Sequence, residues 1–219
     1  MRETRFTLVR HAESEWNAAG RWQGHGDPPL SERGVEQAHQ CAERFAAASV
    51  RVDRLVCSDL VRTRQTAAAI AARLGLTSEP TDLLRELAIG RWTGMTREEI
   101  ARTEPQLLEE FDSGDPNIRP GQLLEEFDSG DPNIRPGGGE TRNEIRLRVR
   151  GVVETLAQGQ PGQHLVLVVH AGVIKALVPE ANPANTEWVE ISLEDIRKAR
   201  PSVRFDPAAT SAVLGESAY

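Results

Sequence analysis

Two apolar segments that lie far apart in the chain each end at a histidine. Phe6 to Val9 lead into Arg10 and His11, and the five apolar residues Leu165 to Val169 lead into His170. Runs of this kind are typical of strands that are buried on both faces, as the strands of a parallel sheet are. Because open α/β sheets bind ligands at the carboxyl ends of their strands, both histidines are candidates for a functional site.

The rest of the chain alternates between helical and extended patterns. Helical spacing follows the N-cap residue Ser31, covers Thr63 to Leu74 up to Gly75, and begins again after Thr141, which forms a capping box with Glu144. The expected apolar face of the first helix consists of Val35, Ala38, Ala42 and Phe45.

Further strands are expected at Val52 to Cys57 and at Val189 to Leu193, where apolar and polar residues alternate. Val203 to Phe205 are a candidate partner for the second of these strands. The repeated strand–helix order predicts an α/β fold, a three-layer sandwich in which helices flank a mainly parallel central sheet.

Length and charge limit the class of protein. A chain of 219 residues without a break in composition predicts a single domain over residues 1–219. Its net charge of -7 argues against nucleic acid or an anionic membrane as the main partner. The apolar run near Met1 is too short for a signal peptide and no run elsewhere could span a bilayer, so we expect a cytoplasmic protein.

An identical repeat precedes the long helix that follows Thr141. Residues 106–121 and 122–137 both read QLLEEFDSGDPNIRPG. Structural repeats diverge in sequence and need three or more copies, so two identical copies indicate a recent duplication. Because Thr103 and Pro105 offer a cap and a helix start, we expect the first copy to be helical and docked, and the second to be a surface excursion.

A third strand end adds positive charge to the predicted site. Ser58 to Arg62 follow a predicted strand, so Arg62 should lie near Arg10 and both histidines. Guanidinium groups suit the recognition of a phosphoryl group, and they disfavour protonation of a neighbouring imidazole, which stays neutral and nucleophilic. Glu86, in an irregular segment, is the candidate proton donor for the leaving oxygen.

Six motifs resemble those of the histidine phosphatase superfamily, which has the phosphoglycerate mutase-like fold. They are LVRHAESEWN, DPPLSERGVEQA, SDLVRTRQTA, LRELAIGRWTGM, GGGET and VVHAGVIKAL, in this order from Leu8 to Leu177. Ala12 and Ala171 replace glycines that are usual in the family, which is tolerable where φ is negative. The stretch VPEANPANTEW is shorter than the corresponding family region.

The resemblance implies roles for seven residues around one phosphoryl group. Three of them take part in catalysis, namely the nucleophile His11, the general acid Glu86, and His170. Four of them bind the phosphate or lie near the substrate, namely Arg10, Arg62, Asn17 and Gln23. Because arginines supply the positive charge, we expect neither a metal ion nor another cofactor. The expected partner is a small phosphomonoester substrate, and we allow for a homodimer.

The resemblance leaves three functions open. The motif ELAIGRWTGM resembles the phosphatase branch, which favours a phosphomonoester hydrolase of the histidine acid phosphatase type that acts on a small phosphorylated metabolite. The first alternative is a phosphoglycerate mutase, an isomerase. A catalytically silent phosphate-binding protein is less favoured, because both histidines, both arginines and the acid are present. The leaving group of the substrate is not predicted.

Overall fold

A mostly parallel sheet forms the centre of the computed structural model, which describes residues 3–48, 50–113, 139–158 and 161–198. Within these residues the sheet has five strands in the order β3-β2-β4-β1-β5, which are β1 (Arg5–Arg10), β2 (Arg54–Ser58), β3 (Ser78–Thr81), β4 (His164–Val169) and β5 (Trp188–Ser192). β1 and β2 both pair in parallel with β4, and β3 pairs in parallel with β2, whereas β5 is antiparallel to β1. The mainly parallel sheet predicted from the sequence is confirmed.

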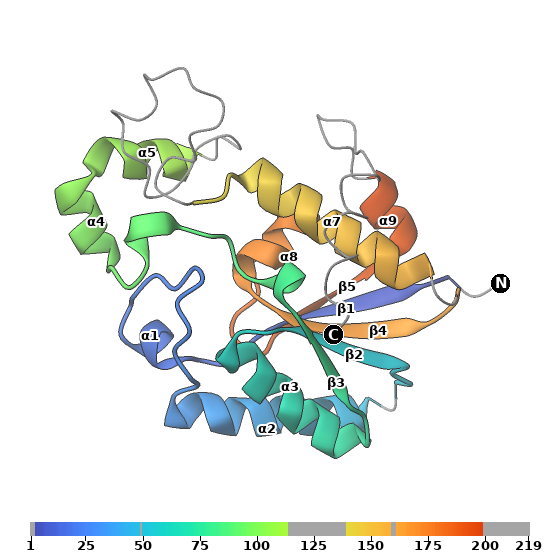
Figure 1. Cartoon of the computed structure of the whole chain (residues 1–219). Coiled ribbons are helices and arrows are strands. Elements are labelled where there is room, and N and C mark those ends of the chain that lie inside the picture. Colours follow the sequence, from blue (N-terminus) through green and yellow to red (C-terminus); the bar gives the residue numbers. More distant parts are fainter. Residues whose placement is uncertain (1–2, 49, 114–138, 159–160, 199–219) are drawn as a thin grey trace, which may run out of the picture.

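Helices cover both faces of the sheet and complete the three-layer sandwich (Figure 1). The layers are α2 (Glu32–Ala47) with α3 (Val61–Leu74) on one face, and α7 (Arg142–Gln158), α8 (Ala171–Leu177) and α9 (Leu193–Lys198) on the other. Among the described residues, no helix combines the length and the apolar character that crossing a bilayer requires.

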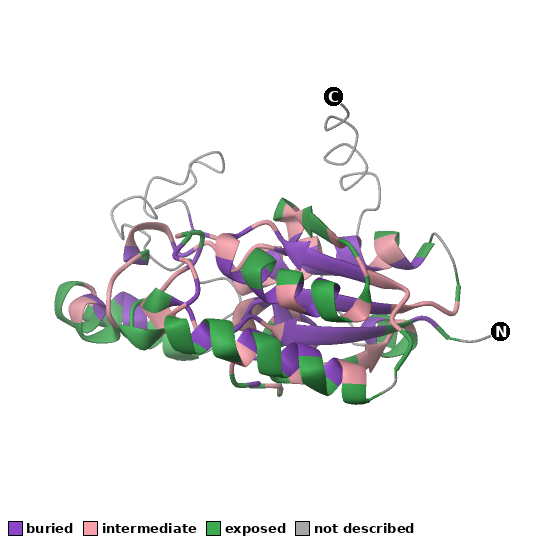
Figure 2. Ribbon diagram, turned by 90° about the horizontal axis from the view of Figure 1, so that it is seen from below, coloured by how far each residue is buried: buried purple, intermediate pink, exposed green. Residues whose placement is uncertain are grey.

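Alternation along the strands produces two hydrophobic cores, one on each side of the sheet. In β4, Leu165 and Leu167 pack with α7 and α8, whereas Val166 and Val168 pack with α2 and α3. All four residues are fully buried, and Figure 2 shows how much of the sheet is buried between the helical layers. The unbroken apolar run in this segment is therefore explained, because both faces of the strand need apolar side chains.

Shorter elements lie beyond the carboxyl ends of the parallel strands. They are α1 (Glu15–Ala18), the 3-10 turns η1 (Asp82–Leu84) and η2 (Gly90–Trp92), α4 (Arg97–Thr103) and α5 (Pro105–Ser113). Figure 1 shows α1, α4 and α5 gathered at this end of the sheet. They extend the edge of the sheet at which a ligand site is expected.

Two local predictions are corrected by the structure. Val35 is 43% exposed, so the buried face of α2 is narrower than its apolar positions suggested. Leu193 begins α9 and does not extend β5. By contrast, Ser31 caps α2 and Gly75 ends α3 in the left-handed region (φ 67°), as predicted. The proposed pairing of residues 203–205 lies outside the described residues.

The described part of the first copy, residues 106–113, is helical and docked, as expected. It begins within α5, where Leu107 and Leu108 are buried and Phe111 packs against the same core. Thr103, however, does not cap α5, because its hydroxyl group donates to the carbonyl oxygen of Glu99 within α4. The second copy, at residues 122–137, lies outside the described part of the chain.

Candidate active site

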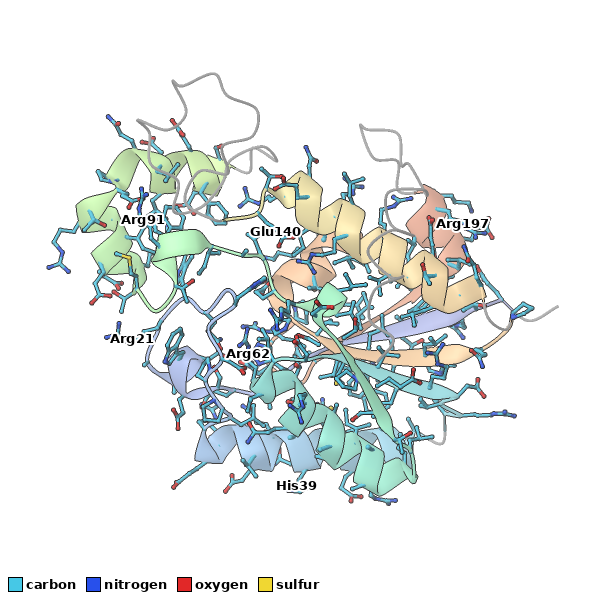
Figure 3. All side chains as sticks on the ribbon, viewed as in Figure 1. Arg21, His39, Arg62, Arg91, Glu140 and Arg197 are labelled. Atoms are coloured by element: carbon cyan, nitrogen blue, oxygen red, sulfur yellow. The ribbon has the colours of Figure 1, made fainter. Side chains whose placement is uncertain are left out.

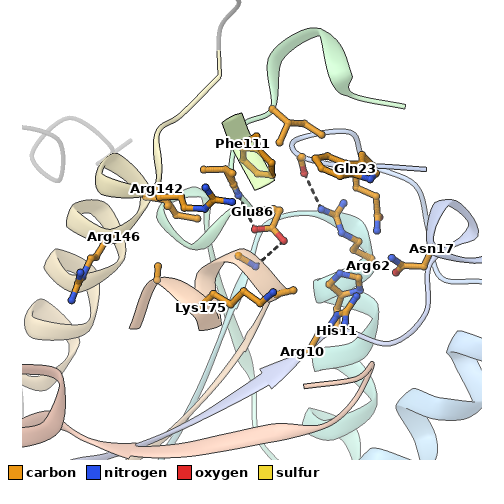
Figure 4. A pocket seen from close by; sticks show the side chains of 18 of the residues that line it. Arg10, His11, Asn17, Gln23, Arg62, Glu86, Phe111, Arg142, Arg146 and Lys175 are labelled. Carbon is orange, nitrogen blue, oxygen red and sulfur yellow. Dashed lines mark hydrogen bonds between the residues drawn. The ribbon is translucent and has the colours of Figure 1, made fainter. Parts of the chain in front are cut away.

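Three neighbouring strands bring the predicted site residues to one edge of the sheet. His11 follows β1, His170 follows β4, and Arg62 lies in the first turn of α3, after β2. These strand ends are adjacent because β4 lies between β1 and β2 and all three are parallel. A pocket of about 590 Å³ opens there, and six of the seven predicted residues line it (Figure 4): Arg10, His11, Asn17, Gln23, Arg62 and Glu86.

His11 is held in one tautomer by its own loop. The residue is 3% exposed, and its Nδ1 lies 2.7 Å from the carbonyl oxygen of Ala12. A carbonyl oxygen can only accept, so Nδ1 carries the proton and Nε2 of the neutral ring keeps its lone pair. Burial, together with the charges of Arg62 and Arg10, lowers the pKa of His11 to about 3. The ring is therefore neutral at pH 7.

The backbone around His11 is fixed by contacts from three other parts of the chain. Its N–H donates to the carbonyl oxygen of Val169 at 3.0 Å, and its carbonyl oxygen accepts from Nδ2 of Asn185 at 2.8 Å. The N–H of Ala12 donates to Oγ1 of Thr66 at 3.1 Å. Asn185 belongs to the short stretch that departs from the family pattern, so this stretch supports the loop that carries His11.

His170 is the one predicted residue that does not line the pocket. It is fully buried and its ring meets the His11 ring edge to face, with the ring centroids 5.2 Å apart. Neither ring nitrogen has a hydrogen-bond partner among the described residues. A buried donor without an acceptor costs about 1–3 kcal/mol. An anionic ligand bound beside His11 would offer such an acceptor.

Because of the two buried histidines, the free energy of unfolding should decrease as the pH falls. Burial, and next the charge of Arg62, lowers the pKa of His170 as well. In the unfolded chain both rings take up a proton near pH 6.5, while the native rings stay neutral. The free energy of unfolding should therefore decrease as pH falls below about 6.5, with a limiting slope of about 1.4 kcal/mol per pH unit for each histidine.

This pH effect can be measured by urea unfolding between pH 7.5 and 5, a range above that in which Asp and Glu ordinarily titrate. We expect His11→Asn to show a shallower loss of stability than the wild type. An exposed-site variant, His39→Asn, is the control and should retain the wild-type slope. Equal slopes for His11→Asn and the wild type would contradict the neutral, buried state of His11.

Both predicted arginines are anchored by carbonyl oxygens of loops. Arg62 is fully buried and donates to Gly26 at 2.7 Å and to Gly24 at 3.0 Å. Arg10 donates to Pro183 at 3.0 Å. Burial lowers the pKa of Arg62 to about 10, so this side chain still carries its charge at pH 7. Two positive charges are thus held in place beside the His11 ring (Figure 4).

Glu86 reaches the pocket from the irregular segment between η1 and η2 (Figure 4). Its Oε1 accepts the N–H of Leu87 at 2.8 Å and its Oε2 accepts the N–H of Gly172 at 3.1 Å. A Cβ atom at Gly172 would lie 2.2 Å from Oε1, so the close approach of the carboxyl group requires glycine there. Both oxygens are thereby positioned by the backbone.

A partly buried ion pair holds the segment that carries Glu86. Nη2 of Arg148, on α7, lies 2.7 Å from Oε2 of Glu140, and both side chains are about one-fifth exposed. Arg148 also donates to the carbonyl oxygen of Leu83, in η1, at 2.8 Å and to that of Arg85, in this segment, at 3.1 Å. Glu140, labelled in Figure 3, accepts the N–H of Ala88 at 3.1 Å. The sequence indicated Glu140 only as part of the GGGET motif, and Arg148 was not predicted.

Two amide side chains also line the pocket near His11. Oδ1 of Asn17 accepts the N–H of Ser14 at 3.2 Å, and Oε1 of Gln23 accepts the hydroxyl group of Ser14 at 2.8 Å. Because both amide oxygens are used in this way, the NH2 groups remain as donors to a ligand. This arrangement suits an anion, which accepts hydrogen bonds and donates few.

Several pocket residues were not predicted from the sequence. The cationic ones are Arg21, Arg142, Arg146 and Lys175, and Phe111 adds an aromatic wall. Arg142 and Arg146 are one helical turn apart, a spacing that is visible in the sequence, but the face on which they lie is set by packing. Trp22 also lines the pocket, whereas Trp92 is buried in the core.

The edge of this parallel sheet presents a neutral histidine, two anchored arginines and a carboxyl group. These are the features of a phosphoryl-binding site with an imidazole nucleophile. The comparison with protein families agrees with this class. The family model of the histidine phosphatase superfamily (branch 1) matches residues 6–195, and the chain belongs to this superfamily.

Similar proteins include phosphatases and a probable mutase. The chain is 33% identical over 173 residues to phosphoserine phosphatase 1 of Hydrogenobacter thermophilus, which covers 79% of this chain and 74% of that protein. It is 30% identical over 213 residues to a probable phosphoglycerate mutase of Yersinia pestis, with 96% and 90% covered. A mycobacterial glucosyl-3-phosphoglycerate phosphatase solved with VO3 matches with a TM-score of 0.69 and 28% identity, with 85% and 91% covered. The phosphoglycerate mutase-like fold is thereby confirmed.

Proposed function

We propose that this protein is a phosphatase that hydrolyses a small phosphorylated metabolite through a phosphohistidine intermediate. The observation that carries the proposal is the state of His11, a neutral buried imidazole whose Nδ1 proton is bound to Ala12. Its Nε2 lone pair makes it a nucleophile, and the fixed charges of Arg10 and Arg62 stabilise negative charge on the phosphoryl oxygens in the transition state.

The reaction takes two steps. In the first, Nε2 of His11 attacks phosphorus, the bond to the leaving oxygen breaks, and Glu86 gives its proton to that oxygen. In the second, water attacks the phosphohistidine and gives a proton to the Glu86 carboxylate, and the N–P bond breaks. Inorganic phosphate leaves and both residues return to their starting states. The amide groups of Asn17 and Gln23 and the ring of His170 supply additional donors to the phosphoryl group.

A phosphoglycerate mutase is the second candidate. It would share the first step and return the phosphoryl group to another hydroxyl group of the substrate in place of water. The similarity to the probable mutase of Yersinia pestis favours this reaction. The similarity to two phosphatases, together with the motif ELAIGRWTGM, favours hydrolysis. A silent phosphate-binding protein is less favoured, because the nucleophile, the acid and the arginines all lie at one pocket.

A direct assay separates these functions. The purified protein is expected to release inorganic phosphate from phosphomonoesters faster than it converts 3-phosphoglycerate to 2-phosphoglycerate. The activity should survive a chelator such as EDTA, because Arg10 and Arg62 supply the charge that a metal ion would otherwise provide. Faster isomerisation than phosphate release would make the protein a mutase, and the absence of both activities would make it a binding protein.

A further inference from the structure

The pocket is strongly cationic although the chain as a whole is acidic. Its described lining contains six positively charged residues and a single carboxylate, Glu86, whereas the net charge of the chain is -7. Arg10 and Arg62 account for the phosphoryl end. A concentration of positive charge beyond that end focuses the electrostatic potential and attracts ligands that carry more than one negative group.

Two of the additional cations, Arg142 and Lys175, lie on the side of the pocket toward α7 and α8. Figure 4 shows His11, Arg10 and Arg62 together, and Arg142 and Lys175 on the side toward α7 and α8, with Glu86 between the two groups. Glu86 is the proposed proton donor to the leaving oxygen. The part of the substrate that departs with this oxygen therefore extends toward Arg142 and Lys175.

Arg142 is positioned by an aromatic platform. Its guanidinium carbon lies 4.2 Å from the centre of the Phe111 ring. Phe111 in turn packs against Trp22 and Trp92, with ring centroids 5.6 Å apart in both pairs. Stacking on a fixed ring orients a guanidinium group for planar recognition of an anion. Phe111 belongs to the first copy of the repeat, so the docked copy supports this end of the pocket.

Arg21 also lines the pocket, but it is not grouped with Arg142 and Lys175. Its guanidinium group already donates to the carbonyl oxygen of Gly94 at 2.6 Å and lies 3.4 Å from the carboxylate of Glu99. Within the described residues Lys175, by contrast, makes no hydrogen bond or ion pair and is exposed at the pocket. An ammonium group on a flexible stem can adjust to a ligand anion.

We infer that the substrate carries a second anionic group, a carboxylate or a second phosphate, on its leaving part, and that Arg142 and Lys175 bind this group. The inference rests on the proposed phosphatase function and adds the chemical class of its substrate. A neutral leaving group of the same size would fill the same space without pairing with these cations, so the pocket selects by charge. Phe111 is a positioning residue that acts through Arg142.

The test uses substrates that differ only in the second charge. 3-Phosphoglycerate and glycerol 3-phosphate differ by a carboxylate in place of a hydroxymethyl group, and fructose 1,6-bisphosphate and fructose 6-phosphate differ by a phosphate. We expect kcat/KM for phosphate release to be higher for the doubly anionic member of at least one pair, by about ten- to a hundredfold, as hydrogen bonds to charged groups allow. The first pair reports a carboxylate and the second a phosphate.

Variants of Arg142 and Lys175 test which residues cause the preference for doubly anionic substrates. Arg142→Gln and Lys175→Met should reduce the kcat/KM ratio of the preferred pair, mainly through KM, and Arg142→Lys should restore part of it. Phe111→Leu, which keeps the apolar volume but removes the ring, should reduce the ratio less. The control is Arg73→Gln, whose guanidinium group lies on the surface of α3, paired with Glu43. It should keep the wild-type ratio.

Two results would overturn the inference. They are equal kcat/KM values within both pairs for the wild type, and an equal loss by Arg142→Gln on both members of the preferred pair. A different result would contradict the proposed phosphatase function itself. It is the absence of hydrolysis both of the matched substrates and of p-nitrophenyl phosphate, which has no second anionic group.

Discussion

Replacing His11 with alanine is expected to abolish phosphate release, with a loss in kcat of at least about a thousandfold. The phosphoenzyme should disappear together with the activity, because the proposed reaction passes through an N–P bond at this residue. Among the described residues that line the pocket, His11 is the single histidine, and the adjacent ring of His170 is fully buried. The wild type should show a phosphoenzyme that is labile to acid and stable to base on a denaturing gel.

A matched variant controls for the loss of a histidine. His39 lies on the exposed side of α2, away from the pocket (Figure 3), so His39→Ala should retain the activity of the wild type. Circular dichroism of both variants verifies that they are folded. Turnover by folded His11→Ala at the wild-type rate would exclude the phosphohistidine mechanism.

Glu86→Gln is expected to slow the reaction by about a hundred- to ten-thousandfold for substrates with poor leaving groups, the usual contribution of a general acid. The amide keeps the size of the side chain but gives no proton to the leaving oxygen. An activated aryl ester such as p-nitrophenyl phosphate needs no such proton, and its first step should be largely spared. Values of kcat/KM across alkyl and aryl esters measure this dependence, because kcat/KM covers only the steps up to release of the leaving group and not the later attack of water.

A second variant, Gly172→Ala, displaces the carboxyl group of Glu86 while leaving Glu86 itself unsubstituted. The Cβ atom of Gly172→Ala would lie 2.2 Å from Oε1 of Glu86, so the carboxyl group must move, and the same dependence on the leaving group should follow. Glu36→Gln, on the exposed surface of α2, is the control and should behave as the wild type. An equal loss of kcat/KM on alkyl and aryl esters for Glu86→Gln would indicate a structural role for Glu86.

The parallel sheet could be predicted from the sequence because burial leaves a direct record in the residue pattern. Leu165 to Val169 are apolar without interruption since β4 packs against helices on both faces. Local signals at helix ends were equally readable, because a cap involves residues close in the chain. Ser31 accepts from Gly34, and Thr141 exchanges hydrogen bonds with Glu144, as their spacing predicted.

Predictions failed where two local solutions competed. The hydroxyl group of Thr103 could cap the following helix or bond back to its own helix, and in the structure it bonds back to Glu99. Leu193 fits the alternation of β5 but begins α9, where Ser192 and Asp195 form hydrogen bonds at the helix start. Val35 was predicted on the buried face of α2 but is exposed. Helical periodicity does not reveal how much of the helix surface the sheet covers.

The residues that meet at the edge of the sheet could be predicted from the residue pattern and the chain direction. His11, His170 and Arg62 each follow a strand, and parallel strands place their carboxyl ends together, so the proximity of these residues follows from chain direction alone. The protonation state of His11 and the position of its loop, by contrast, depend on the tertiary structure. The depressed pKa of His11 depends on burial, and its backbone is fixed by Asn185, far along the chain.

The end of the pocket that contains Arg142 and Lys175 could not be predicted from the residue pattern. Arg142 enters it from α7 over the ring of Phe111, and Lys175 enters from α8. Arg148 and Glu140 hold the segment that carries Glu86. These contacts join segments that no pattern of neighbouring residues relates, because each depends on how helices rotate and pack, whereas a strand that ends at a histidine is a local property of the chain.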